Sequence, residues 1–247
     1  MKPCFLLFLL IAFISSCAQE LVDSRKQEIV FRSINVVPMH DELIKNNQDV
    51  IIKNGRVTAI GNTGKIRYDK NALVIDARGK YLIPGLAEMH AHVPPVDELE
   101  PMKDVLMLFA LNGVTTIRGM LGHPRHLELR SKLQSEEIFG PRFYTSGPSF
   151  NGNSVKDSET GAAMVKQQKQ AGYDFLKLHP GLTQETFNAV AKTAKEVNIP
   201  FAGHVSFDVG VWTAIDAGYA TIDHLDGFVE SLVPGIDTLT EEQNGLF

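Results

Sequence analysis

Cysteine is almost absent from this chain of 247 residues, which holds only Cys4 and Cys17. Two cysteines so near the start cannot form a disulfide framework. Basic charge is also scarce, because 24 Lys and Arg are set against 29 Asp and Glu, and the net charge is -5. This balance offers no surface for a polyanion, so we expect no nucleic-acid partner. Long apolar runs are missing too, since the run at residues 5–14 is shorter than the about 20 residues needed to cross a bilayer.

What is present is the composition of a globular protein. Apolar residues make up 44% of the chain and charged residues 21%, which excludes disordered, collagen-like and polytopic membrane proteins. A chain of this length fits one large domain or two small ones and can bury a sizeable core.

The first residues have the pattern of a secretory signal peptide, with a positive start at Lys2 followed by the apolar run 5–14. The run ends in Ile14-Ser15-Ser16-Cys17, which resembles the bacterial lipobox, whose cysteine is lipidated and becomes the new N-terminus. Ordinary cleavage after Ala18 is the alternative. We expect residues 1–16 to be removed and Cys17 to carry a lipid anchor that holds the protein at a membrane without spanning it. The predicted location is extracytoplasmic, at a bacterial outer membrane or in the periplasm.

Residues 17–82 are predicted to form a small β-sandwich segment. Short stretches rich in β-branched residues alternate there with turn signals. Asn54-Gly55 suits the positive φ angles of a type I′ hairpin turn. The expected strands lie at residues 29–31, 49–52, 56–60 and 73–76.

Residues 83–247 are predicted to form an α/β unit, because apolar strand candidates alternate with helical stretches. Such alternation indicates a parallel sheet with helices outside, either doubly wound or a (β/α)8 barrel of the TIM type. About six strand–helix units are visible, so the barrel is partial and we expect a chain that is incomplete. The expected strands are residues 85–92, 114–118, 142–146, 175–178, 201–205 and 221–225, and the expected helices are 103–111, 126–134, 159–170, 184–197 and 211–217.

Four of the eight histidines lie at the ends of these expected strands. His90 and His92 are two positions apart, so on a strand they share one face and can bind one divalent ion. A His-X-His pair alone can equally be two solvated loop residues. His204 and His224 end two further strands, at the edge where barrel active sites are built. Together they predict a metal site.

The order of motifs around these histidines resembles the amidohydrolase superfamily, in particular its imidazolonepropionase-like and Xaa-Pro dipeptidase-like members. Residues 76–86 (DARGKYLIPGL) followed by 88–92 (EMHAH) resemble the opening of that family's barrel. The likeness extends over residues 49–228, and the later strands of the family resemble residues 113–118 (GVTTIR), 140–148 and 172–177 (GYDFLK).

This resemblance implies a metal-dependent hydrolase that cleaves amide or cyclic-amide C–N bonds of small molecules or small peptides. By it, His90 and His92 hold the more buried of two divalent ions, which are zinc by preference and manganese or cobalt as alternatives. Lys177, carboxylated, bridges the two ions, while His204 and His224 hold the second. Lys177 and His224 are accordingly the implied catalytic residues. His179, Arg118 and Tyr144 are weaker candidates for substrate contacts.

Some positions depart from the family pattern. Arg118 is followed by Gly119 where the family has aspartate, and the family's acid/base aspartate on strand eight has no counterpart. Asp223 is expected to face away from the site and Asp226 to lie beyond the strand. We therefore expect the chain alone to be weakly active or inactive. The alternative is a non-catalytic lipoprotein that binds metal or a small ligand, and the sequence does not predict an oligomeric state.

Overall fold

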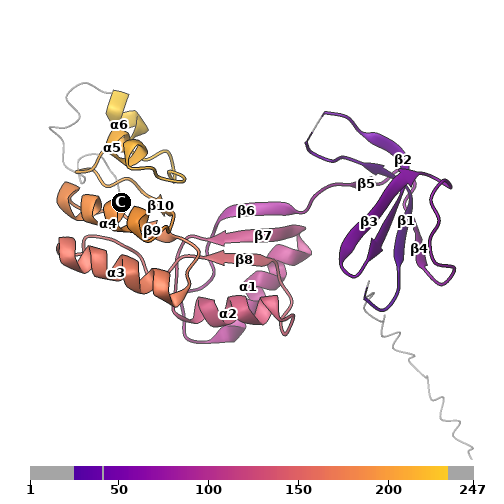
Figure 1. The fold of residues 1–247 in the computed structure, drawn as a ribbon, viewed down its shortest axis with the longest axis horizontal. Coiled ribbons are helices and arrows are strands. Elements are labelled where there is room, and N and C mark those ends of the chain that lie inside the picture. Colours follow the sequence, from indigo (N-terminus) through magenta and orange to yellow (C-terminus); the bar gives the residue numbers. More distant parts are fainter. Residues whose placement is uncertain (1–24, 41, 233–247) are drawn as a thin grey trace, which may run out of the picture. The chain divides into compact units, whose positions relative to one another are not determined.

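The computed structural model describes residues 25–40 and 42–232, and these fall into two compact units divided after Pro84 (Figure 1). Each unit is described by itself. The predicted signal segment and Cys17 lie outside the described residues. None of the helices in the described part is both long enough and apolar enough to cross a membrane.

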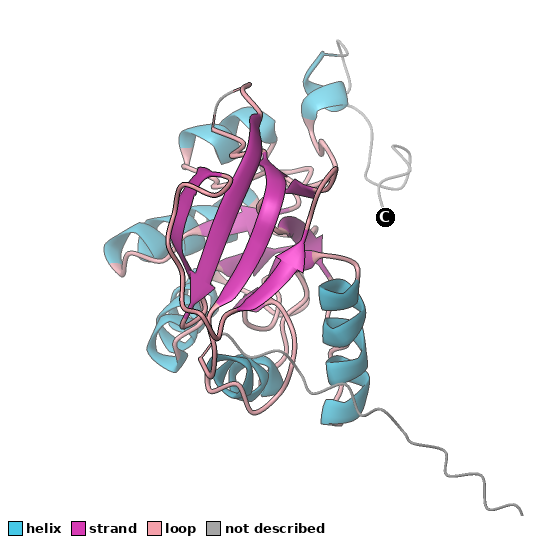
Figure 2. Cartoon of the chain, turned by 90° about the vertical axis from the view of Figure 1, so that its right-hand side faces the viewer, coloured by secondary structure: helices cyan, strands magenta, loops and turns pink. Residues whose placement is uncertain are grey.

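The N-terminal unit contains one five-stranded sheet, seen face on in Figure 2. The strand order is β3-β2-β1-β4, and β5 also pairs with β1. Asn54 and Gly55 have φ angles of 52° and 69° in the β2–β3 turn, as the Asn-Gly signal predicts. The described residues of this unit form a single sheet, so the predicted β-sandwich is not confirmed. The strands are β1 (Ile29–Val36), β2 (Lys45–Lys53), β3 (Arg56–Asn62), β4 (Leu73–Asp76) and β5 (Tyr81–Leu82).

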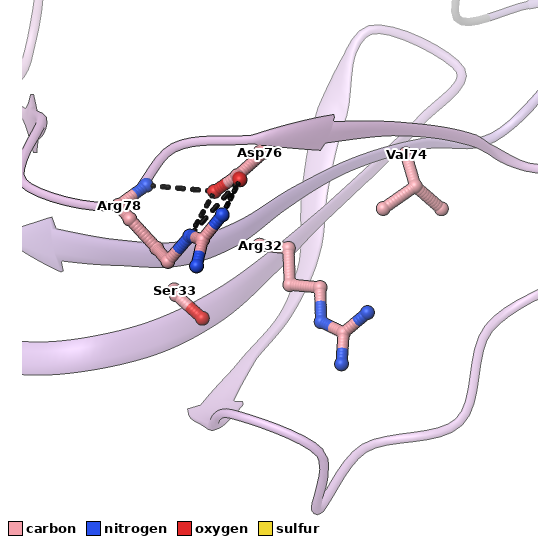
Figure 3. A pocket seen from close by; sticks show the side chains of 5 residues that line it. All are labelled: Arg32, Ser33, Val74, Asp76 and Arg78. Atoms are coloured by element: carbon pink, nitrogen blue, oxygen red, sulfur yellow. Dashed lines mark hydrogen bonds and ion pairs between the residues drawn. The ribbon is translucent and has the colours of Figure 1, made fainter.

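A hollow of about 410 Å³ on this unit is lined by Arg32, Ser33, Val74, Asp76 and Arg78 (Figure 3). The Asp76 carboxylate in this hollow already forms an ion pair with Arg78, whose Nη2 lies 2.5 Å from Asp76 Oδ2. The Arg78 hydrogen bonds lower the pKa of Asp76 below its usual value. The hollow contains no histidine among its lining residues, and its two arginines and one aspartate leave one net positive charge.

The C-terminal unit is built from parallel strands that alternate with helices (Figure 1). One sheet has the order β6-β7-β8 and the other pairs β9 with β10, all parallel. Isolated bridges from Ser146 to Phe175 and from Phe150 to Leu178 join the two sheets in chain order. The strands are β6 (Leu86–Ala91), β7 (Val114–Gly119), β8 (Arg142–Thr145), β9 (Leu176–Leu178) and β10 (Phe201–Gly203).

The helices of this unit bury apolar faces against the strands. Met102 and Leu106 of α1 and Leu129 of α2 pack in one core with the β6–β8 sheet. Phe187 and Val190 of α4 pack in a second core with β9 and β10. The helices are α1 (Leu99–Leu111), α2 (Arg125–Gln134), α3 (Ser158–Ala171), α4 (Gln184–Glu196), α5 (Val211–Asp216) and α6 (Phe228–Leu232).

The alternating α/β pattern is confirmed, but the described residues do not close a barrel. The sixth expected strand, residues 221–225, is wrong. Only Ile222 makes a bridge there, to Gly203. His224 and Leu225 have φ angles of 54° and 62°, which a strand cannot have, so the chain turns instead.

Candidate metal centre

Five histidine rings form a continuous chain in the C-terminal unit. His90 lies on β6 and His92 just after it, His204 follows β10, and His224 follows the bridge at Ile222. Ring centroids are 5.2 Å apart between His90 and His92, 4.7 Å between His90 and His224, and 4.9 Å between His204 and His224. The fifth ring, that of His179, stacks on His204 at 5.0 Å. The parallel strands thus bring together side chains that are far apart in the sequence.

The His90–His92 pair has the spacing of two ligands to one ion. Their Nε2 atoms are 3.2 Å apart, and two nitrogens bound at about 2.1 Å to one tetrahedral zinc would lie about 3.4 Å apart. Burial lowers the pKa of His90, which favours the neutral imidazole that metals require. Glu88 fixes the local backbone, because its Oε1 accepts a hydrogen bond from His90 N at 2.8 Å.

Lys177 lies in β9 and its side chain is completely buried. Its Nζ donates a hydrogen bond to Asp223 Oδ2. Burial lowers the pKa of the Lys177 amine, and Asp223 opposes this shift by stabilising the charged form. A buried lysine with a lowered pKa is closer to the neutral amine that carboxylation needs.

Asp223 faces the cluster, so the prediction that it points away is wrong. Its side chain is 4% exposed, and Oδ2 lies 3.4 Å from His90 Nδ1. Oδ1 lies 4.0 Å from Arg118 Nη2. The prediction failed because it assumed strand alternation, whereas the chain turns after Asp223.

The turn from Asp223 to Asp226 is closed by a hydrogen bond from Asp226 N to Asp223 O at 3.1 Å. Its two central residues, His224 and Leu225, both have positive φ, as in a type I′ turn. Such a conformation is costly for leucine, by about 1–2 kcal/mol, and persists only where the surroundings enforce it. The turn brings both aspartates to the cluster, and Asp226 Oδ2 lies 2.7 Å from His204 Nδ1.

His204 is positioned closely by its neighbours on β10. A Cβ atom on Gly203, which has φ 141°, would lie 2.0 Å from Leu178 O, so only glycine permits this approach. His204 N donates to Leu178 O at 2.9 Å, and Tyr219 donates its hydroxyl hydrogen to His204 O at 2.9 Å. Burial raises the pKa of Tyr219, which keeps this hydroxyl protonated as a donor.

The three predicted substrate contacts differ in their surroundings. Arg118 donates from Nε to Met89 O at 2.8 Å and from Nη2 to Thr221 Oγ1 at 2.9 Å, so it ties β6 to the later bridge segment. Tyr144 pairs in register with Arg118 on the neighbouring strand and is 42% exposed. His179 has a pKa lowered to about 4, mainly by burial. Its buried Nδ1 has no hydrogen-bond partner among the described residues.

Two other histidines lie apart from the cluster. His126 is fully buried, with its ring against Phe143 and Nε2 3.2 Å from Pro94 O. His123 Nε2 lies 3.7 Å from Asp97 Oδ1. Both residues lie at or just before the start of α2 and are not part of the chain of histidine rings.

The cluster supplies imidazoles, a lysine and carboxylates, which is the donor chemistry that zinc, manganese and cobalt accept. Within the described ranges no three His, Cys, Asp or Glu side chains already converge as a finished ligand set. The His90–His92 pair and its neighbouring rings nevertheless fit the chemistry of a divalent ion. Residues 90, 92, 177, 204 and 224 are therefore the candidate ligands.

The comparisons with known proteins match part of the chain. No protein-family model matches the chain. Dihydroorotase of Thermoanaerobacter sp. (strain X514) is 35% identical over 74 residues, or 29% of this chain and 16% of that protein. Adenine deaminase of Ruegeria sp. (strain TM1040) is 32% identical over 66 residues, or 27% of this chain and 11% of that protein.

Solved structures resemble a larger part of the chain. A Xaa-Pro dipeptidase with bound methionine has a TM-score of 0.66 and 20% identity, over 79% of this chain and 61% of that one. A prolidase from Bifidobacterium longum has a TM-score of 0.69 and 22% identity, over 79% of this chain and 54% of that one. The chain therefore spans little more than half the length of these structures. Its fold is similar to part of these solved structures, and a stretch of its sequence is similar to the dihydroorotase.

Proposed function

We propose that the C-terminal unit carries the metal centre of a hydrolase that cleaves amide or cyclic-amide C–N bonds in small substrates. The observation that supports this most is the gathering of His90, His92, His204 and His224 beside the buried Lys177. Similar solved structures include a prolidase with bound N-methylphosphonate-L-proline, so a dipeptide-like substrate is a reasonable choice for testing.

In this proposal His90 and His92 would hold one divalent ion, His204 and His224 would hold a second, and Lys177, once carboxylated, would supply a carboxylate ligand to the centre. Zinc is the preferred ion, with manganese or cobalt as alternatives. When bound, such ions lower the pKa of water to near neutrality and polarise a carbonyl.

The chain's own residues prepare and orient this site. Burial favours the neutral amine of Lys177, and Asp223 is within reach of both Lys177 and His90. Arg118 and Tyr144 occupy paired positions on β7 and β8 and are proposed to contact the substrate. Arg118 is also held by Met89 and Thr221, so its guanidinium has a fixed position for this role.

The metal proposal is tested by elemental analysis of purified protein. We expect wild type to bind about two divalent ions per chain, and the double variant His90→Ala with His92→Ala to lose at least one. His123→Ala is the matched control, because His123 lies outside the ring chain. Unchanged metal content in the double variant would refute the assignment of this pair.

The reaction is tested with a panel of dipeptides and cyclic amides in the presence of zinc or manganese. Turnover that is lost in Lys177→Ala but not in His123→Ala supports the hydrolase. Because the chain alone is expected to be weakly active or inactive, the panel is also run on a form extended to the length of the similar structures. Metal binding by both forms without turnover of any amide would instead favour the non-catalytic, metal-binding alternative.

We also propose that Cys17 carries a lipid and holds the protein in an extracytoplasmic compartment. This rests on the sequence Ile14-Ser15-Ser16-Cys17 alone. Cys17→Ala should release the protein from the membrane fraction or block its maturation. A variant that fractionates and migrates like wild type would contradict this proposal.

A further inference from the structure

His204 makes one contact that the proposed metal site does not explain. Its Nδ1 lies 2.7 Å from Asp226 Oδ2, a normal length for a charge-assisted hydrogen bond. Both side chains are largely shielded, with 20% of His204 and 15% of Asp226 exposed. Asp226 belongs to the turn in which His224 and Leu225 take positive φ angles. An unfavourable backbone conformation is therefore maintained at the place that brings this carboxylate to the ring.

We propose that Asp226 is a positioning residue that fixes the orientation and tautomer of His204. An aspartate that accepts a hydrogen bond from Nδ1–H holds the proton on that nitrogen. The Nε2 lone pair is then available to bind a metal ion. Histidines that bind metals commonly donate their other ring N–H to a carboxylate in this way. The role of this positioning in metal binding rests on the proposed function.

The other contacts of His204 restrict the residue but do not set its tautomer. Leu178 O and Tyr219 OH bind its backbone N–H and carbonyl. The His179 ring stacks on one side at 5.0 Å, and the His224 ring lies 4.9 Å away. Asp226 is the only carboxylate among the described residues that contacts the His204 ring. Control of the proton position thus falls to Asp226.

The tautomer is measured in metal-free protein by long-range ¹H–¹⁵N NMR of the histidine rings at mildly alkaline pH. We expect wild-type His204 to carry its proton on Nδ1. Asp226→Ala should lose this single tautomer. Asp226→Asn keeps an acceptor oxygen without the charge, should retain part of the preference, and serves if the alanine variant does not fold. Asp216→Ala, at an exposed position on α5, is the matched control and should behave as wild type.

Metal affinity is measured in the same variants by titration with zinc alone. Loss of a carboxylate partner typically weakens metal binding about 10- to 100-fold, and we expect this for Asp226→Ala but not for Asp216→Ala. A wild-type proton on Nε2 would overturn the inference. An Asp226→Ala variant with unchanged tautomer and zinc affinity within about twofold of wild type would do so as well. If wild type binds no zinc, the proposed function fails, while the tautomer measurement still decides the role of Asp226.

Discussion

Replacing Asp223 with asparagine should destabilise the metal-free protein more than replacing its partner Lys177 with methionine. Lys177 is completely buried and forms an ion pair with Asp223, so Asp223→Asn leaves an ammonium group buried without its counter-ion. Removing one partner of a buried ion pair costs about 3–5 kcal/mol. For a chain of this size that corresponds to a decrease of about 6–20 °C in Tm.

Lys177→Met should cost less, about 1–3 kcal/mol, by loss of a hydrogen bond to a charged group. Asp223 then retains His90 Nδ1 at 3.4 Å and Arg118 Nη2 at 4.0 Å as basic neighbours. The double variant should recover part of the Asp223→Asn loss, because its buried ammonium is gone. The difference between the double variant and the sum of the single variants measures how strongly the two side chains interact.

The size of the Asp223→Asn effect should also depend on pH. Burial lowers the pKa of folded Lys177, whereas an unfolded lysine titrates near pH 10.4, so the folded protein binds fewer protons between these values. Stability therefore rises as the pH increases through this range, and it does so more strongly once Asp223 no longer holds the charged form. The loss of stability caused by Asp223→Asn should therefore become smaller toward alkaline pH.

The assay is urea unfolding followed by circular dichroism, in chelator-treated protein and in buffer depleted of carbon dioxide so that Lys177 stays unmodified. A loss below about 1 kcal/mol for Asp223→Asn would refute the reasoning. So would a Lys177→Met variant that is the less stable of the two, because the asymmetry follows directly from the neighbours of each group.

Three further outcomes are expected. NMR titration should show that His179 remains neutral at physiological pH, because burial lowers its pKa to about 4 in the folded protein. The contribution of His179 to stability should be complete above a pH of about 6.5 and lost as the pH falls toward 4. A pKa near the ordinary histidine value would contradict this. Gly203→Ala should yield little folded protein, because its Cβ would lie 2.0 Å from Leu178 O. Gly210→Ala is the control in solubility and melting measurements, since Gly210 also has positive φ but a Cβ there would meet nothing within 4 Å. Thr183→Ala should cost about 1 kcal/mol in urea unfolding, because Thr183 Oγ1 caps α4 by accepting from Thr186 N, and Thr183→Ser should restore most of it.

The strand-end histidines show how far the sequence alone can lead. The spacing of His90 and His92 predicts a shared face because a strand has a two-residue period, and the structure places their Nε2 atoms 3.2 Å apart. The Asn54-Gly55 turn and the Thr183 cap were likewise predictable, since each depends on residues that are adjacent or nearly so. Local rules are sufficient wherever the contact itself is local.

Asp223 and His126 show where such rules fail. The alternation rule placed Asp223 on the outside, but positive φ angles at the next two residues replace the strand with a turn. Nothing in a His-Leu pair predicts a turn of this kind, because glycine or asparagine usually occupies such positions. The burial of His126 depends on Phe143 and Pro94, which come from other parts of the chain. Tertiary packing, not residue type, decided both.

The separation of the candidate ligands along the chain has a thermodynamic consequence. His90 and His92 lie on or just after β6, and Lys177 and His204 lie on β9 and just after β10. Isolated β-bridges link the two sheets that carry them. An unfolded chain does not hold these groups together, so an ion bound by the proposed site would bind the folded state almost exclusively. Metal affinity and folding are then one linked equilibrium. At a free metal concentration of 100 times Kd the folded state would gain about 2.7 kcal/mol, a large share of the 5–15 kcal/mol that typically stabilises a domain. The metal would hold the two halves of the unit together as much as it would serve the reaction.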